Sequence, residues 1–395
     1  MSAKLWQSTT SSNLHPLVEA YTVGSDYQAD QQLLGYDIVA TKAHVTMLET
    51  IGVLTQNELK QLTTALNDLH KLWLLGKFSV EKHDEDGHTA IEAYLTEQLG
   101  AVGKKVHSGR SRNDQALVMV RLYLKDTLDQ LATLVIQVAK AYADAARMAG
   151  NTPMPGYTHM QKAMPTTVTT WLGSFADGFN DMQALLTITR QTIDQNPLGS
   201  AAGFGVSLPI DRQHTTDSLG FAKIQTNPMY CGLSRGLFEL MAVQALVPIM
   251  TLAGKFAQDV LIFTTQEFNF FSLPHTLTTG SSIMPHKHNY DLFEIMRGHA
   301  NAFGGYSQQL QAIVNGMGSG YNRDIQLTKA ILLTAMESAQ STLEILILTV
   351  PQLELHHEVL LAAMTDDLYS VKKVNKLVEQ GVPFRDAYSV VKSKL

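Results

Sequence analysis

Residues 280–294, GSSIMPHKHNYDLFE, combine side-chain types that can remove a proton from carbon. A glycine and two serines permit motion, a proline limits it, and Lys287 and Asn289 add a fixed cation and an amide. Glu294 follows at the start of the next expected helix. Such a set can present a hydroxyl to a substrate carbon and stabilise the carboxylate-derived dianion that forms. The alternative, a flexible linker with surface cations, fits this tight basic cluster less well.

A second polar linker, KKVHSGRSRNDQ at 104–115, precedes the longest expected helix. Ser111 and Asn113, together with backbone N–H groups at the helix start, could form a cradle for an anion. Arg110 or Arg112 could add a bidentate contact to a carboxylate. A lone S-x-N pattern also fits an ordinary helix cap, which is the commoner use of these residues.

Two further linkers carry histidines. MPGYTHMQKAMP, residues 154–165, is interpreted as a loop held between prolines, and its His159 could exchange protons if a carboxylate orients it. HDEDGHTAIE, residues 83–92, mixes histidines and acids but lacks a metal-ligand spacing. A capped acidic turn is the better interpretation of that segment, and the sequence predicts no metal site.

Long helices must position these linkers. Thr55 and Glu58 have the spacing of a capping box before a periodic apolar run. Residues 116–149 contain neither glycine nor proline, and one apolar stripe recurs there at spacings of three and four. The members of that stripe are Leu117, Val120, Leu124, Leu128, Leu131 and Val135. Further long helices are expected at about 166–195, 229–265 and 325–348. The pattern predicts an all-α protein with a central bundle of long helices.

The linkers also suggest a division into three domains. We expect an N-terminal helical domain at 1–105, the long-helix bundle at 106–352, and a short or truncated C-terminal helical domain at 353–395. Apolar residues such as Val118 and Ile136 lie beside the main stripe, so the long helices are expected to bury more than one face. That pattern favours an oligomer.

Composition narrows the class of protein. Apolar residues make up 45% of the chain and charged residues 17%, and the net charge of −6 gives no footprint for nucleic acid. The single cysteine, Cys231, cannot form an internal disulfide, which favours a reducing compartment. The longest uncharged apolar run, 240–254, is too short to span a bilayer, and the first residues lack a signal-peptide core. A cytoplasmic protein that binds neither nucleic acid nor membrane is expected.

Taken together, the linkers resemble those of a known family. GSSIMPHKHN is similar to the GSSxMPxKxN loop of the fumarase/aspartase superfamily, whose members release fumarate from a succinyl group. HSGRSRNDQ, MPGYTHMQ and NPLGSAAGFGVSLPIDR resemble the argininosuccinate lyases within it, and the resemblance runs from about residue 5 to the end. It implies an all-α fold whose four copies form a twenty-helix core. It also implies active sites that each draw linkers from three subunits.

The resemblance implies roles for individual residues. Ser281 matches the base that removes the proton from the succinyl Cβ, and Lys287 and Asn289 match groups that hold the carboxylate where charge accumulates. His159 matches the catalytic histidine, with Glu294 as its carboxylate partner from another subunit. The other residues implied to lie around the substrate's carboxylates and amino-acid end are Ser111, Arg112, Asn113, Thr158, Tyr321, Gln326, Lys329, Asp30 and Asp86.

The implied reaction is the elimination of fumarate from argininosuccinate, leaving arginine, by general acid/base catalysis without a metal, nucleotide or redox cofactor. Two alternatives stay open. One is a sister lyase acting on another succinyl-amine, such as an acylated argininosuccinate. The other is a structural protein of the delta-crystallin kind, against which the retained Ser281 and His159 argue.

The sequence departs from the family pattern at several points. His288 stands where relatives commonly have a second lysine, and Leu327 and Thr328 replace an acidic pair. Residues 227–236 lack the usual acidic side chains. The segment YTVGSDYQAD, residues 21–30, aligns only with a gap, so Ser25 is left as an unsettled ligand.

Overall fold

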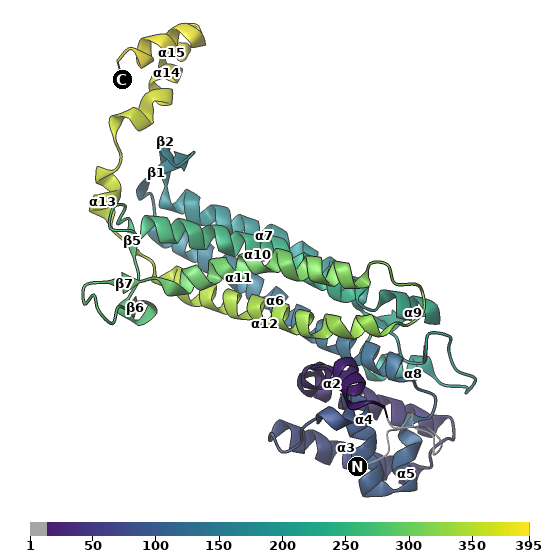
Figure 1. The fold of residues 1–395 in the computed structure, drawn as a ribbon. Helices are drawn as coiled ribbons and strands as arrows, with labels where there is room; N and C mark the ends of the chain where they lie inside the picture. Colours follow the sequence, from purple (N-terminus) through teal and green to yellow (C-terminus); the bar gives the residue numbers. More distant parts are fainter. Residues whose placement is uncertain (1–13, 395) are drawn as a thin grey trace. The chain divides into compact units, whose positions relative to one another are not determined.

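The computed structural model describes residues 14–394, and helices dominate that part of the chain (Figure 1). The amino-terminal residues 1–13, in which no signal-peptide core is predicted, lie outside the described part. The all-α prediction is confirmed.

Five α-helices lie in the amino-terminal part of the described chain. They are α1 (Pro16–Val23), α2 (Asp26–Thr50), α3 (Gln56–Leu74), α4 (Gly87–Leu99) and α5 (Ala101–Lys104). The capping box is confirmed, because Thr55 Oγ1 accepts from the Glu58 backbone N–H at 3.3 Å and a Glu58 carboxylate oxygen accepts from the Thr55 N–H at 2.9 Å. The 25-residue α2 has no counterpart among the helices expected from the sequence.

Five long helices carry most of the rest of the fold. They are α6 (Arg112–Ala149), α7 (Val168–Ile193), α10 (Leu237–Phe263), α11 (Asp291–Val314) and α12 (Thr328–Thr349). Every member of the apolar stripe predicted on α6 is buried, at 7% exposure or less. Its neighbour Val118 is buried as well, whereas Ile136 is 49% exposed.

The helix expected over 229–265 is two helices, α9 (Pro228–Ser234) and α10. Gly236 separates them with a φ of +78°, a conformation that disfavours any residue with a side chain. A Cβ at this position would also collide with the side chains of Ile325 and Val314. Close packing of these segments therefore requires the break at Gly236.

The remaining α-helices in the described residues are short: α8 (Arg212–Ser218), α13 (His357–Ala362), α14 (Ser370–Glu379) and α15 (Phe384–Lys392). The strands form four two-stranded sheets. They pair β1 (Pro153–Thr158) with β2 (Gln161–Thr167), β3 (Gln195–Asn196) with β4 (Lys223–Ile224), β5 (Phe271–Ser272) with β8 (Glu354–Leu355), and β6 (Thr279–Gly280) with β7 (His288–Asn289). The loop interpretation of 154–165 is wrong in this respect, since most of that segment belongs to the β1–β2 hairpin.

The chain divides into two compact units. Unit 1 comprises Met1–Gln130, Leu185–Leu246 and Gly304–Glu337, and unit 2 comprises Leu131–Ala184, Val247–Phe303 and Ser338–Leu395. Each of the five long helices contributes residues to both units. The three-domain division at 1–105, 106–352 and 353–395 stays a prediction.

Each unit has its own core. In unit 1, buried residues of α2, α3 and α4, among them Leu34, Leu66 and Ile91, pack into one apolar cluster. In unit 2, aromatic rings of α6, α7 and α10 meet around Phe256, whose centroid lies 4.9 Å from that of Tyr142 and 5.6 Å from that of Trp171. Aromatic pairs of this kind stabilise the packing of these three helices against one another.

Within residues 14–394, two segments, Leu237–Phe263 and Arg323–Gln352, are long and apolar enough to cross a membrane by length and composition alone. The uncharged run at 240–254 is thus part of a longer apolar helix than the sequence suggested. In the most apolar 18-residue stretch of each segment, 56% and 50% of the stretch, respectively, is buried in the described structure. Core helices of a helical bundle have the same length and composition.

Candidate active site

A polar cavity of about 350 Å³ lies within unit 1, a volume suited to a small molecule. Eight of the predicted site residues line it: Asp30, Asp86, Ser111, Arg112, Asn113, Tyr321, Gln326 and Lys329. The sequence did not single out six further lining residues as ligands: Asp26, His88, His107, Ala116, Arg235 and Arg323. Segments almost 300 residues apart in the chain therefore share one cavity.

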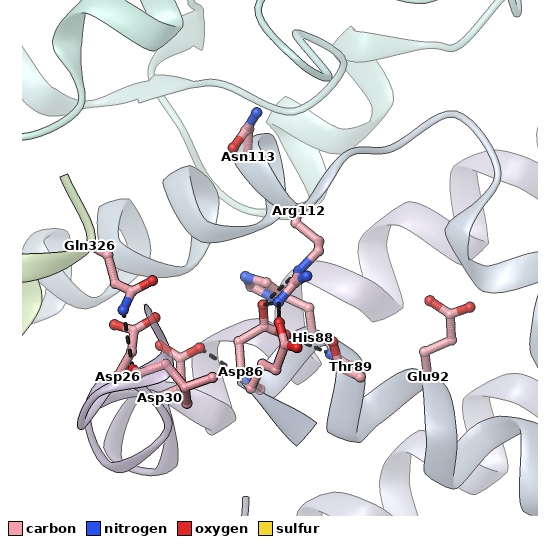
Figure 2. A network of polar contacts seen from close by, with 12 residues as sticks. Asp26, Asp30, Asp86, His88, Thr89, Glu92, Arg112, Asn113 and Gln326 are labelled. Carbon is pink, nitrogen blue, oxygen red and sulfur yellow. Dashed lines mark hydrogen bonds and ion pairs between the residues drawn. The ribbon is translucent and has the colours of Figure 1, made fainter. Parts of the chain in front are cut away.

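At one end of the cavity, Lys329 at the start of α12 meets two carboxylates of α2. Its Nζ lies 2.8 Å from Asp26 Oδ1 and also donates to Asp30 Oδ1. Nearby, the Gln326 side-chain amide donates to the Thr22 and Val23 carbonyl oxygens at the end of α1, at 3.1 and 3.2 Å. Figure 2 shows Asp26 and Asp30 together below Gln326. The Lys329 contacts join α12 to α2, and the Gln326 contacts join the segment just before α12 to the end of α1.

The charged groups in this cluster perturb one another. Burial works to lower the pKa of Lys329, but Asp30 and Asp26 outweigh burial and raise it. Burial also raises the pKa of Asp26 to about 6, with Lys329 opposing that shift. The lysine is therefore held charged, while Asp26 titrates close to neutrality.

Arg112 and Asp86 form the second ion pair of the cavity. Arg112 Nε lies 2.7 Å from Asp86 Oδ2, a second guanidinium nitrogen contacts the same oxygen, and Glu85 is 3.5 Å away (Figure 2). Asp86 is also the N-cap of α4, because its Oδ1 accepts from the Thr89 N–H at 2.9 Å. Burial works to raise the pKa of Asp86, but His88 and Arg112 hold it below its usual value. The predicted capped acidic turn is present, and its cap faces the cavity.

Behind this pair, the Nδ1–H group of His88 donates a short hydrogen bond of 2.5 Å to Asp37 Oδ2 of α2. Both side chains are almost completely buried. Burial works to lower the pKa of His88, but the Asp37 carboxylate outweighs burial and raises it. No pattern in the sequence pointed to Asp37, and only the tertiary contact between α2 and α4 identifies it as the partner of His88.

The start of α6 is organised by Asp114. Its Oδ1 accepts from the Ser111 N–H at 2.8 Å, and its Oδ2 accepts from the N–H groups of Gly199 and Ala201 at 3.1 and 2.9 Å. The 197–203 linker is thereby fixed beside the helix start. Figure 2 shows the Asn113 amide directed away from the Arg112 ion pair. A smaller cavity of about 100 Å³, lined partly by this linker, shares Asn113, Arg235 and Tyr321 with the first.

The other predicted site residues belong to unit 2. Thr158 ends β1, and His159 and Met160 form the two-residue turn to β2, with φ of 53° and 60°. Positive φ at both turn positions is the geometry of a type I′ hairpin, which usually takes Asn or Gly. Two residues with long side chains hold this conformation at a cost, and such strain is often found at functional sites.

The 280–294 segment forms the β6–β7 hairpin and the first turn of α11. Ser281 Oγ accepts from the Met284 N–H at 3.1 Å, and the Asn289 amide donates to Thr279 Oγ1 and Gly280 O, both at 3.4 Å. Lys287 lies in the exposed part of the loop, and Glu294 lies exposed in the first turn of α11. The loop is ordered by local hydrogen bonds and presents its cation outward.

The predicted residues thus fall into two groups. Eight line the unit 1 cavity, and the other six, Thr158, His159, Ser281, Lys287, Asn289 and Glu294, lie on hairpins and a helix start of unit 2. Within residues 14–394, no hydrogen bond or ion pair joins His159 to Glu294. Ser25 precedes α2 without a side-chain cap bond, and it is Asp26 that reaches the cavity. The roles assigned to all these residues stay predictions.

Comparisons with known proteins agree along the chain. Residues 11–304 match a family model described as a lyase. An argininosuccinate lyase of Sorangium cellulosum (strain So ce56) is 42% identical over 395 residues, covering 100% of this chain and 91% of the relative. One from Thermotoga neapolitana is 39% identical over 394 residues, covering 100% of this chain and 98% of the relative.

Solved structures agree on the fold. EDDS lyase in complex with formate superposes with a TM-score of 0.79 at 24% identity, covering 97% of this chain and 76% of that chain. Class II fumarase from Schistosoma mansoni gives a TM-score of 0.81 at 15% identity, covering 95% and 87%. At these identities the similarity supports the fold alone.

Proposed function

Because the chain belongs to the argininosuccinate lyase family, we propose that it splits argininosuccinate reversibly into arginine and fumarate. The observation that carries this proposal is the 42% identity to an argininosuccinate lyase across all 395 residues. The reaction would give the protein a place in arginine biosynthesis.

The charges of the unit 1 cavity support this substrate. Argininosuccinate carries carboxylates at both ends, an α-ammonium and a guanidinium, so a site for it needs groups of both signs. The cavity offers four cations, Arg112, Arg235, Arg323 and Lys329, beside three aspartates. In this proposal, these side chains together with Ser111, Asn113, Tyr321 and Gln326 bind the substrate.

The chemical step is proposed for the unit 2 residues. Ser281, ionised to its alkoxide, takes the proton from the succinyl Cβ and becomes a neutral hydroxyl. The electron pair of that C–H bond forms the new double bond, and the Cα–N bond breaks. The guanidino nitrogen then receives a proton from the side of His159 and Glu294 and leaves as arginine. A free serine hydroxyl is too weakly acidic to ionise near neutral pH. Closure of the loop must therefore exclude water from Ser281 and bring it close to the Lys287 cation. Thr158 and Asn289 are proposed to hold the succinyl carboxylates.

A homotetramer with shared sites is part of the proposal. Large apolar side chains are exposed on the long helices of the single chain: Ile136, Leu185, Ile188, Ile295 and Leu348. Contacts with other copies would bury such faces. Shared sites also explain why the binding residues and the chemical residues lie in different units of one chain. We place the enzyme in the cytoplasm, in keeping with its single, buried cysteine.

The reverse reaction tests this function. Purified protein incubated with fumarate and arginine should form argininosuccinate, detected by its mass, because a catalyst accelerates both directions of one equilibrium. Omission of arginine is the control. Formation of no argininosuccinate, under conditions in which an established argininosuccinate lyase forms it, would reject the proposal.

A further inference from the structure

Of the three aspartates that line the cavity, Asp26 forms the fewest hydrogen bonds and ion pairs with the rest of the described chain. Its side chain is 10% exposed, and its Oδ1 contacts Lys329 at 2.8 Å. Its second oxygen, Oδ2, accepts no hydrogen bond from any residue of the described chain. A carboxylate can accept about four hydrogen bonds, so one that is nine-tenths buried with an idle oxygen at a cavity wall is poised for a ligand.

The neighbouring carboxylates are already engaged. Asp30 is fully buried, with Oδ1 on Lys329 and Oδ2 accepting from the Gly87 N–H at 3.0 Å. Asp86 is occupied by Arg112 and by its cap bond to Thr89. Asp26 and Asp30 share the single ammonium of Lys329, so these three side chains together carry a net charge of −1 when all are ionised. A ligand group placed beside Asp26 should therefore be a cation with N–H donors.

A partner for a ligand carboxylate lies at the same cavity. Arg235 places its guanidinium 5.1 Å from the centroid of the Tyr321 ring and forms no ion pair within residues 14–394. Within the described residues, the cavity wall thus carries a carboxylate oxygen without a hydrogen bond, that of Asp26, and a guanidinium without an ion pair, that of Arg235. Together they match an amino acid with free α-ammonium and α-carboxylate groups.

Building on the proposed function, we propose that Asp26 receives the free α-ammonium of the substrate's arginine end and makes the enzyme reject substrates in which that nitrogen is acylated. Acylation converts the ammonium to a neutral amide and leaves the Asp26 carboxylate buried without its cation. Sites built to pair a polar group discriminate strongly against ligands that lack it. This assignment decides between argininosuccinate and an acylated relative in favour of the former.

The test compares three substrates on the full-length enzyme. They are argininosuccinate, its Nα-acetyl derivative, and the desamino analogue, which lacks the α-nitrogen and so removes charge without adding bulk. For the wild type, kcat/KM should be about 10- to 150-fold higher for argininosuccinate than for the desamino analogue, the range expected for one charged hydrogen bond. Asp26→Asn should reduce that preference to within a few-fold by raising KM for argininosuccinate, with kcat little changed.

Two further variants serve as controls. Asp26→Glu keeps the carboxylate and should retain a preference for the free amine. Asp68→Asn removes an exposed carboxylate of α3, whose one ion pair within residues 14–394 is with Lys71 at 3.4 Å, and should behave as wild type. A wild type that turns over the desamino analogue as well as argininosuccinate overturns the proposal without any variant. An Asp26→Asn enzyme that is folded and keeps the full preference also overturns it.

A binding measurement separates this proposal from the proposed function. Calorimetry with L-arginine and with 5-guanidinopentanoate, its desamino analogue, needs no turnover. The wild type should bind arginine more tightly by the same factor, and Asp26→Asn should bind the two alike. If no fumarate is released from any substrate, the proposed function fails, and this ligand pair still decides the role of Asp26.

Discussion

Lys329 lies between Asp26 and Asp30, and only 5% of its side chain is exposed. Its ammonium group is therefore already paired with two carboxylates of the protein when no substrate is bound. The resemblance to the family assigns it to the substrate's amino-acid end. The geometry adds a second task, because its ammonium holds two carboxylates of α2 in place. Removal of one partner from a buried ion pair leaves the other charge buried without compensation. The resulting loss of stability is larger than the net stabilisation that the intact pair provides.

Lys329→Met should therefore raise KM for argininosuccinate about 10- to 150-fold while leaving kcat within a few-fold, since its contacts are remote from the reacting carbon. It should also lower the free energy of unfolding by about 3–5 kcal/mol. Steady-state kinetics and urea denaturation measure the two effects. Lys71→Met, which removes a 73% exposed lysine, is the matched control and should change neither. Unchanged KM with a collapsed kcat would place Lys329 in the chemical step.

Asp26 should make substrate affinity depend on pH. Burial raises its pKa to about 6 against the opposing charge of Lys329, with Asp30 and Asp86 adding to the rise. Only the ionised carboxylate pairs with an ammonium, so affinity is full above about pH 6 and is lost as pH falls through that value. A plot of log(1/KM) should decline by about one unit per pH unit below the inflection. Asp26→Asn should abolish the inflection, and its persistence in that variant would assign it to another group.

At the scale of elements, the β1–β2 hairpin is the feature that the sequence concealed. Its strands contain Pro153, Pro155 and Pro165, and its turn lacks the Asn-Gly signal that usually marks a type I′ hairpin. The prolines and the histidine therefore looked like an irregular loop. Tertiary packing favours the hairpin instead, and Tyr157 on β1 approaches the rings of Phe268 and Phe263, with centroids 5.6 and 6.1 Å away.

His159→Asn should lower kcat about 10²- to 10⁴-fold without loss of stability. Asparagine tolerates positive φ well, so the turn should be kept while the imidazole is removed. Met160→Gly is the matched control: it relieves the same backbone strain by up to about 1 kcal/mol and should leave kcat unchanged. Thermal unfolding and steady-state kinetics measure both variants. A His159→Asn enzyme within a few-fold of wild-type kcat would contradict the proposed role.

Other elements were open to prediction where local signals agree with the final packing. The stripe on α6 and the capping box before α3 depend on side-chain spacing alone, and both are confirmed. The break between α9 and α10 depends on how Gly236 packs against Ile325 and Val314, which no local pattern contains. The site residues divide in the same way. Family motifs identified Asp30 and Lys329, but the alignment gap near Ser25 left Asp26 unassigned. Only the contact between α2 and α12 in the folded chain shows that Asp26 belongs to the site.

At the scale of the whole molecule, shared active sites predict complementation between inactive chains. Ser281→Ala and His159→Asn should each be nearly inactive alone. After the two are mixed and their subunits exchange, part of the activity should return, because some sites receive both intact linkers. Mass photometry before and after mixing should show tetramers throughout. A mixture of two preparations of Ser281→Ala is the control, and absence of recovery after verified exchange would count against shared sites.

Product release from argininosuccinate tests most directly whether this chain is a carbon–nitrogen lyase acting on that substrate. Purified protein should release fumarate, followed by its ultraviolet absorbance, and arginine, measured by mass spectrometry, in equal amounts at every time point. The Ser281→Ala variant should release both about 10²- to 10⁴-fold more slowly. Release of no fumarate by the folded, assembled wild type, or of fumarate without an equal amount of arginine, would contradict the account.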